Sequence, residues 1–166
     1  MRNQIIGISA GRSGTKSLVK ILNQNGIQFT HEHPKGVVNW HGYSGLKFNN
    51  IFPANIKHVE KYLKKGHKVI YLKRGKMTCK RSWLEWLAKW DYNHFQSKKP
   101  KCQYDICYPT YSNKLTLDDA VENYLKEYEK ISKKLIKKYP QHVHTLTTMD
   151  LNDKDKINDL LEFING

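Results

Sequence analysis

The residues best suited to chemistry form a short segment near the N-terminus, which reads Gly11-Arg12-Ser13-Gly14-Thr15-Lys16-Ser17. It follows an isoleucine-rich run and precedes leucines at helical spacing, so we expect it to join a buried strand to a helix. Glycines let the backbone turn close to a phosphate, and the first turn of a helix offers unpaired N–H groups at its positive end. The segment therefore predicts a phosphate-binding loop. A plain tight turn is the alternative, and a Walker A loop is excluded because Thr15 stands where that pattern needs glycine.

A second pair of candidate residues follows another apolar run. The run Val69-Ile70-Tyr71-Leu72 leads into Lys73 and Arg74, and Ser82 stands eight residues after Arg74. An arginine grips phosphate through a planar fork of donors, and a hydroxyl one to two helical turns further on can point back toward the same strand end. An arginine and a serine at this spacing can be coincidence when they occur alone. Their place at a second strand end, after the first segment, favours a second anion site.

Together the two segments resemble the nucleotide-binding motifs of the sulfotransferases. In that family a lysine or arginine precedes Ser/Thr-Gly-Thr at the mouth of the first helix, and an arginine at a later strand end is followed eight residues on by a serine. The resemblance implies that the chain binds 3'-phosphoadenosine 5'-phosphosulfate (PAPS) as sulfuryl donor. The residues implied for the donor are Arg12, Ser13, Gly14, Thr15, Lys16 and Ser17 at the 5'-phosphosulfate, and Arg74 and Ser82 at the 3'-phosphate.

Lys16 departs from the family pattern. The family usually has threonine or serine at this position, so the hydroxyl contact is either lost or supplied by Ser17. The charges of Lys16 and Arg12 suit a site where negative charge grows during transfer, and the resemblance implies a catalytic role for both. The Arg-Lys-Gly loop that closes over the nucleotide in cytosolic members has no counterpart here.

A third match is the polar end of another predicted strand, Thr30-His31-Glu32-His33. Several sulfotransferases that this chain resembles place the carboxylate that takes the acceptor proton near this point. We expect Glu32 to be that general base, with His33 as second choice, and the alternative is a solvated polar strand end. With His41 the cluster also raises the question of a metal. We expect none, because adjacent strand residues point to opposite faces and the set lacks a tight ligand spacing.

The elements that must position these residues alternate between strand and helix. Apolar runs predict strands over 4–9, 27–30, 68–73 and 143–147, while helical periodicity predicts helices around 18–22, 56–63, 77–90, 117–139 and 157–164. This order predicts an α/β three-layer sandwich with a mainly parallel sheet of four to five strands, whose carboxyl ends form the ligand edge. It is similar to the P-loop NTPase-like core of the sulfotransferases.

We expect one domain over residues 1–166, with an irregular aromatic-rich insertion at about 91–113. The insertion is the candidate acceptor-binding region, because it has no regular period and contains Pro100 and Pro109. Trp83, Trp86, Leu87 and Trp90 fall on one face of a predicted helix, where core packing is the simplest interpretation.

The most extreme number in the composition is the formal net charge of +14, which implies a polyanionic partner or a multiply phosphorylated ligand. Much of it comes from helix lysines for which a solvated face is the simplest interpretation: Lys61, Lys64, Lys65, Lys133, Lys134, Lys137 and Lys138. The three cysteines match neither a zinc site nor a disulfide framework, and the sequence lacks an apolar stretch of membrane-spanning length. We therefore expect a soluble, cytoplasmic protein.

The expected function is transfer of a sulfuryl group from PAPS to a hydroxyl or amine on a small molecule or saccharide, without a metal. Two other functions stay open. A P-loop-like nucleotide kinase or NTPase shares the layout, although Lys73 and Arg74 stand where a magnesium-holding aspartate is expected. A basic nucleic-acid-binding module, which we favour less, could use the positive charge together with aromatic residues between 83 and 111.

Overall fold

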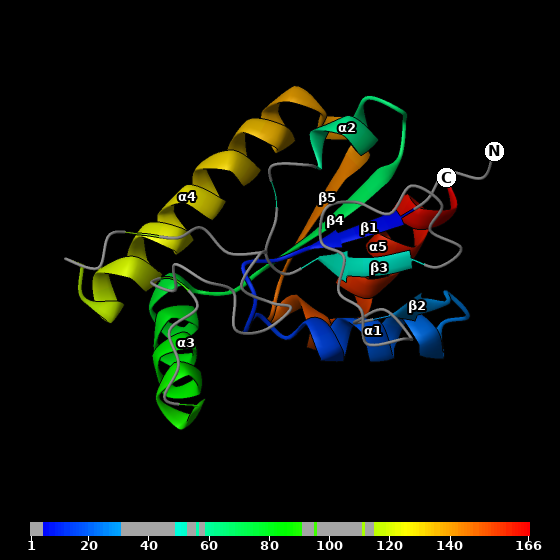
Figure 1. Cartoon of the computed structure of the whole chain (residues 1–166). Coiled ribbons are helices and arrows are strands. Elements are labelled where there is room, and N and C mark those ends of the chain that lie inside the picture. The colour runs from blue at the N-terminus through cyan, green and yellow to red at the C-terminus, as the bar shows by residue number, and fades with distance from the viewer. Residues whose placement is uncertain are drawn as a thin grey trace.

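A parallel β-sheet forms the centre of the molecule in the computed structural model, which describes residues 5–30, 49–52, 56, 59–90, 95, 111 and 115–166. The five strands found there are β1 (Ile5–Ile8), β2 (Phe29–Thr30), β3 (Asn49–Phe52), β4 (Lys68–Lys73) and β5 (Val143–Thr147), in the order β2-β3-β1-β4-β5. Every pair is parallel, so the carboxyl ends of all five strands lie at one edge of the sheet (Figure 1).

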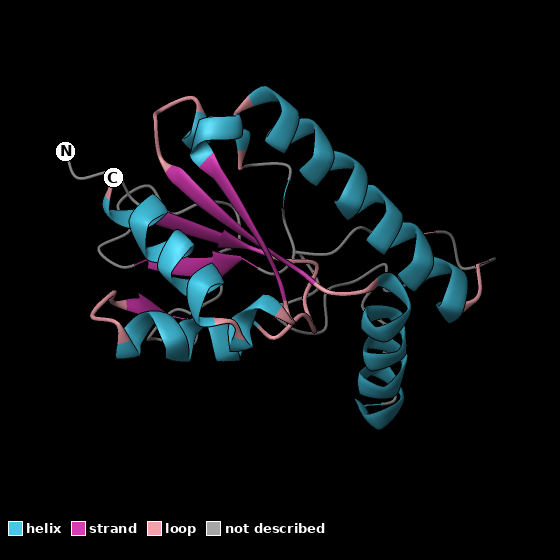
Figure 2. Ribbon diagram, turned by 180° about the vertical axis from the view of Figure 1, so that it is seen from behind, coloured by secondary structure: helices cyan, strands magenta, loops and turns pink. Residues whose placement is uncertain are grey.

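Helices cover both faces of this sheet, as Figure 2 shows. Helices α1 (Thr15–Gln24) and α5 (Lys154–Asn165) lie on one face, and α2 (Glu60–Leu63), α3 (Lys76–Trp90) and α4 (Leu117–Lys138) lie on the other. Successive strand residues point to opposite faces, so each face of the sheet has its own hydrophobic core. Ile5 and Ile70 pack in the core under α1 and α5, while Ile6 and Val69 pack in the core under α2, α3 and α4. The central strands must therefore be apolar along their length, which accounts for their isoleucine- and valine-rich sequences.

Local sequence signals set the ends of the two clearest helices. The Thr116 hydroxyl accepts the Asp119 N–H at the start of α4, and the Asp153 carboxylate accepts the Asp155 and Lys156 N–H groups at the start of α5. Helix α4 also has two aspartates in its first turn and two lysines in its last, which complements the helix dipole. None of the helices in the described ranges is long and apolar enough to cross a membrane.

The sequence-based prediction of an α/β fold with a parallel sheet is confirmed, and the predicted bounds of β4 and β5 match the structure. One detail was wrong, because β3 was not predicted at all. Of the predicted helix over 56–63, Glu60–Leu63 is α-helical and Ile56 has 3-10 helical geometry, while residues 57 and 58 lie outside the described residues. Most of the predicted insertion at 91–113 lies outside the described residues. Within it Phe95 is fully buried, with its ring 5.5 Å from that of Trp83, so Trp83 belongs to the core as expected.

Candidate functional site

The segment between β1 and α1 has an unusual backbone. Gly11, Arg12 and Gly14 all adopt positive φ angles, of 74°, 52° and 80°. Glycine takes such angles readily, but a side chain like that of Arg12 is strained there by about 1–2 kcal/mol. Contacts from the surrounding framework must therefore hold the loop in this shape.

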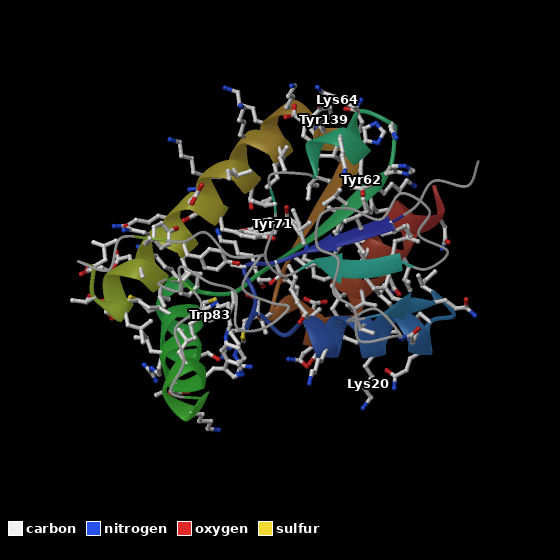
Figure 3. The ribbon with its side chains drawn as sticks, viewed as in Figure 1. Lys20, Tyr62, Lys64, Tyr71, Trp83 and Tyr139 are labelled. Carbon is white, nitrogen blue, oxygen red and sulfur yellow. The ribbon has the colours of Figure 1, made fainter. Side chains whose placement is uncertain are left out.

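Helix α3, together with the loop residue Ser13, supplies the first set of those contacts through side-chain donors that bind carbonyl groups of the loop. Trp83 Nε1 donates to the Ala10 carbonyl at 3.0 Å, and Figure 3 shows Trp83 beside the loop. The buried Ser13 hydroxyl donates to the Gly11 carbonyl at 2.9 Å, and the Cys79 thiol donates to the same oxygen at 3.4 Å. Burial raises the pKa of the Cys79 thiol, so the proton that it donates stays in place at neutral pH.

The ends of two strands supply the second set. Arg74, directly after β4, donates from Nη1 to the Arg12 carbonyl at 2.7 Å. Thr148, directly after β5, places its hydroxyl 3.3 Å from the Ser13 carbonyl. The carbonyl groups of four consecutive loop residues, 10 to 13, are therefore each bound by at least one side chain from outside the loop.

This arrangement determines where the loop N–H groups point. In a planar trans peptide the carbonyl of one residue and the N–H of the next point in opposite directions. Holding the carbonyls of Gly11, Arg12 and Ser13 toward the framework therefore turns the N–H groups of Arg12, Ser13 and Gly14 away from it. These three N–H groups make no hydrogen bond within the part of the chain that the structure describes. Consecutive outward N–H groups form the kind of backbone nest that binds anions.

The first turn of α1 adds to this nest. Gly14 is its N-cap without a side-chain capping bond, and its first turn contains no acidic residue, so the positive end of the helix dipole is not neutralised locally. Thr15 is buried, whereas the side chains of Lys16 and Ser17 are exposed. Lys16 and Ser17 are thus open to solvent at the positive end of α1.

The two predicted phosphate motifs meet in space although they lie about 60 to 70 residues apart in the chain. Besides the bond from Arg74, the Arg12 Nε donates to Ser82 Oγ at 3.3 Å. A hydroxyl has one donor and two acceptor positions, so Ser82 can still donate its own proton to a ligand. Among the described residues neither Arg12 nor Arg74 forms an ion pair with a carboxylate. Two arginines at one loop, neither in an ion pair within the described ranges, make this edge of the sheet attractive to an anion.

A cavity of about 290 Å³ lies beside the loop, between the end of β4 and helix α4. Tyr71, Leu125 and Tyr128 form apolar parts of its wall, and Tyr71 is labelled in Figure 3. Its lining also includes four charged residues, Lys73, Arg74, Lys76 and Glu129. The cavity shares Ser13 and Arg74 with the candidate site.

Part of the predicted site lies outside the described residues. Glu32 and His33, the two choices for a general base, belong to this part, together with His31 and His41. Strand β2, which precedes them, is separated from β1 by β3. Among the described residues no cluster of His, Cys, Asp and Glu side chains could hold a metal ion.

Sequence reasoning missed three residues that support the loop: Cys79, Trp83 and Thr148. Each binds a backbone carbonyl, and the position of a carbonyl leaves no trace in sequence patterns. Thr148 carried one usable signal, since it follows a predicted strand and had to lie at the ligand edge of the sheet.

Gly11 gives a direct test of how tightly α3 holds the loop. A Cβ added at Gly11 would lie 2.8 Å from Cζ2 of Trp83, at a φ that already disfavours a side chain. We expect Gly11→Ala to lower the free energy of unfolding by about 2–3 kcal/mol, the sum of backbone strain and local overpacking. Urea denaturation measures the change. Gly26→Ala is the matched control, because Gly26 has a φ of 78° and nothing within 4 Å, so about 1 kcal/mol is expected. Equal losses in the two variants would show that Trp83 does not confine the loop.

Comparisons with known proteins agree with this fold. No protein-family model and no curated protein matches the chain. Among solved structures, the crystal structure of mouse sulfotransferase SULT7A1 complexed with PAP superposes with a TM-score of 0.58 at 13% sequence identity. The match covers 99% of this chain and 59% of the mouse chain, so this chain spans well under two thirds of its neighbour's length. The likeness shows a sulfotransferase-like α/β fold.

Proposed function

We propose that the chain is a sulfotransferase that binds PAPS at the carboxyl edge of its sheet. The observation that carries the proposal is the direct contact between the two candidate anion sites. The loop after β1 presents three outward N–H groups, and Arg74 binds the same loop at 2.7 Å while Ser82 contacts Arg12 at 3.3 Å. A ligand with two anionic groups on one nucleoside fits this pair of sites. That the mouse neighbour was solved with PAP adds support.

In the proposed reaction the acceptor oxygen or nitrogen attacks the donor sulfur in line, and the bond from sulfur to the 5'-phosphate oxygen breaks. Negative charge then grows on the leaving phosphate oxygen and on the sulfuryl oxygens. The N–H groups of the loop, with Arg12 and Lys16, would stabilise that charge without reorganising. Arg74 and Ser82 would hold the 3'-phosphate away from the breaking bond. Glu32, or His33 in its place, would accept the proton that the acceptor loses.

The first test measures binding of the product nucleotide 3',5'-bisphosphoadenosine through its effect on thermal unfolding of the protein. Adenosine 5'-monophosphate is the matched control, because it lacks only the 3'-phosphate. At a hundredfold excess over its dissociation constant the bisphosphate should stabilise the fold by about 2.7 kcal/mol. The monophosphate at the same concentration should give less than about 1 kcal/mol, because it loses the charged contacts to the 3'-phosphate.

ADP and ATP complete the experiment, since they carry two and three phosphates on the 5' side only. If the bisphosphate and the monophosphate stabilise equally, the assignment of Arg74 and Ser82 to a 3'-phosphate is wrong. If ADP or ATP stabilises more than the bisphosphate, a nucleotide kinase or NTPase replaces the sulfotransferase as the best proposal.

A further inference from the structure

We propose that Thr148 is a positioning residue for the anion-binding loop: its hydroxyl aims the Gly14 N–H at the bound anion by fixing the carbonyl of Ser13. The inference rests on the proposed function, because it assumes that the loop holds an anionic group of the donor. Thr148 itself would not touch the ligand.

The contacts of Thr148 join two parts of the candidate site. Its backbone N–H donates to the Lys73 carbonyl at 2.8 Å, which extends the pairing of β4 with β5 by one residue. Its hydroxyl oxygen lies 3.2 Å from that carbonyl and 3.3 Å from the carbonyl of Ser13. Its methyl group would lie 3.2 Å from a Cβ added to Gly14, so it packs closely against the loop backbone. One side chain therefore contacts the loop and the end of β4 together.

The hydroxyl proton of Thr148 can serve either carbonyl, but the two are not equivalent. The Lys73 carbonyl already accepts the Thr148 N–H. In the structure the Ser13 carbonyl accepts a hydrogen bond from Thr148 alone among the described residues. The Thr148 hydroxyl therefore matters most for the Ser13 carbonyl. Without this hydroxyl, the peptide unit between Ser13 and Gly14 would be free to rotate. Because the N–H of that unit belongs to Gly14, rotation of the unit would turn an anion-binding donor away.

The position of Thr148 also links the two proposed phosphate sites. Lys73, whose carbonyl it contacts, is directly followed by Arg74, and Arg74 binds the Arg12 carbonyl in the loop. The loop is thus attached to the sheet edge at two neighbouring carbonyls, one by Arg74 and one by Thr148. An anion held by the loop needs both attachments, because each one orients a different N–H group.

The test replaces the hydroxyl and the methyl group of Thr148 separately. Thr148→Val keeps the branched shape and removes the donor, and Thr148→Ser keeps the donor and removes the methyl group. Thr145→Val is the matched control, since Thr145 lies exposed on β5 and has no contact with the loop among the described residues. Calorimetry with 3',5'-bisphosphoadenosine and with inorganic pyrophosphate gives the affinities, and thermal unfolding gives the stability.

We expect Thr148→Val to bind both ligands roughly five- to tenfold more weakly, the scale of one lost hydrogen bond. Thr148→Ser and Thr145→Val should bind within about twofold of the parent chain, since each leaves the hydrogen bond of residue 148 in place. Parent affinity in Thr148→Val, or an equal loss in Thr148→Ser, would overturn the positioning role. A fall in thermal midpoint with unchanged affinity would also overturn it, because a purely structural residue behaves that way. If the parent chain binds pyrophosphate but not the bisphosphate, the proposed function fails while the pyrophosphate comparison still tests Thr148. Binding of neither ligand overturns both.

Discussion

Replacing Arg74 by alanine should weaken binding of 3',5'-bisphosphoadenosine by about 30- to 100-fold. A charge-assisted hydrogen bond contributes about 1.5–3 kcal/mol, and the guanidinium fork can bind a phosphate while one of its nitrogens still holds the Arg12 carbonyl. The affinity for adenosine 5'-monophosphate should fall only a few-fold. Arg74 would affect the 5'-phosphate only indirectly, through its hydrogen bond to the loop. Isothermal titration calorimetry with both nucleotides measures the two changes.

Two further variants make this test specific. Arg81→Ala removes an exposed arginine of helix α3, which begins two residues after Arg74, and should leave the affinities for both nucleotides unchanged. Arg74→Lys keeps the charge but loses the planar fork, so it should recover only part of the affinity. If Arg74→Ala weakens the two nucleotides equally, Arg74 acts by shaping the loop alone, and its assignment to the 3'-phosphate is wrong.

The sequence predicted the strands best where they are buried on both faces. The four residues from Val69 to Leu72 are apolar and buried, and a short run of this kind is typical of a strand in the middle of a parallel sheet. Strand β3 was missed because Asn49-Asn50-Ile51-Phe52 is short and begins with two asparagines, which are depleted in strands. It is a strand because it pairs with β1 and β2, and such distant pairings cannot be read from a local window.

For the candidate site, the sequence predicted which residues lie close together, but it did not predict the directions of their side chains. Arg12, Arg74 and Ser82 were expected at one edge and are joined there by hydrogen bonds. Their expected roles as ligand contacts remain proposals. The Ser13 hydroxyl, by contrast, is turned inward to the Gly11 carbonyl, so only its backbone N–H is placed to serve an anion. A motif specifies residue types at a spacing, whereas the direction of a hydroxyl depends on the three-dimensional environment.

The positive charge of the chain is spread well beyond this site. Lysines of α4 and α2 are exposed, and some are paired: Lys133 lies 2.9 Å from Glu129, and Lys138 is bonded to Glu60. Tyr139, which follows α4 and is labelled in Figure 3, also donates to Glu60 of α2 at 3.1 Å. Strand β5 begins just after α4 and ends near the loop, so the pair of Lys138 and Glu60 lies at the opposite end of the sheet, whereas Glu129 lines the cavity beside Arg74. The arginines at the loop therefore matter for the site through their placement and not through the net charge.

Replacing Glu32 by glutamine should leave nucleotide binding intact and lower turnover by roughly a hundredfold or more. The change keeps size and polarity but removes the basic oxygen, and loss of a positioned general base has effects of this size. Strand β2 ends at Thr30, two residues before Glu32 in the sequence, and β3 lies between β2 and β1. With neighbouring strands about 4.8 Å apart, β2 and β1 are roughly 10 Å apart across the sheet, so the expected base follows a different strand from the one that leads into the donor loop. Single-turnover transfer from PAPS to a panel of hydroxyl and amine acceptors measures the chemical step.

His33→Ala and His31→Ala are the matched variants, since they flank the same position in the sequence. Full turnover in Glu32→Gln together with loss in either histidine variant would assign the proton to an imidazole instead. The pH profile separates these cases, because a carboxylate base stays active to lower pH than an imidazole, whose ordinary pKa is about 6.5. If all three variants keep full turnover, this strand end is solvated polar surface, and the acceptor proton leaves to water or to another residue. Weakened binding of 3',5'-bisphosphoadenosine in Glu32→Gln would contradict the separation of base and donor site on which the prediction depends.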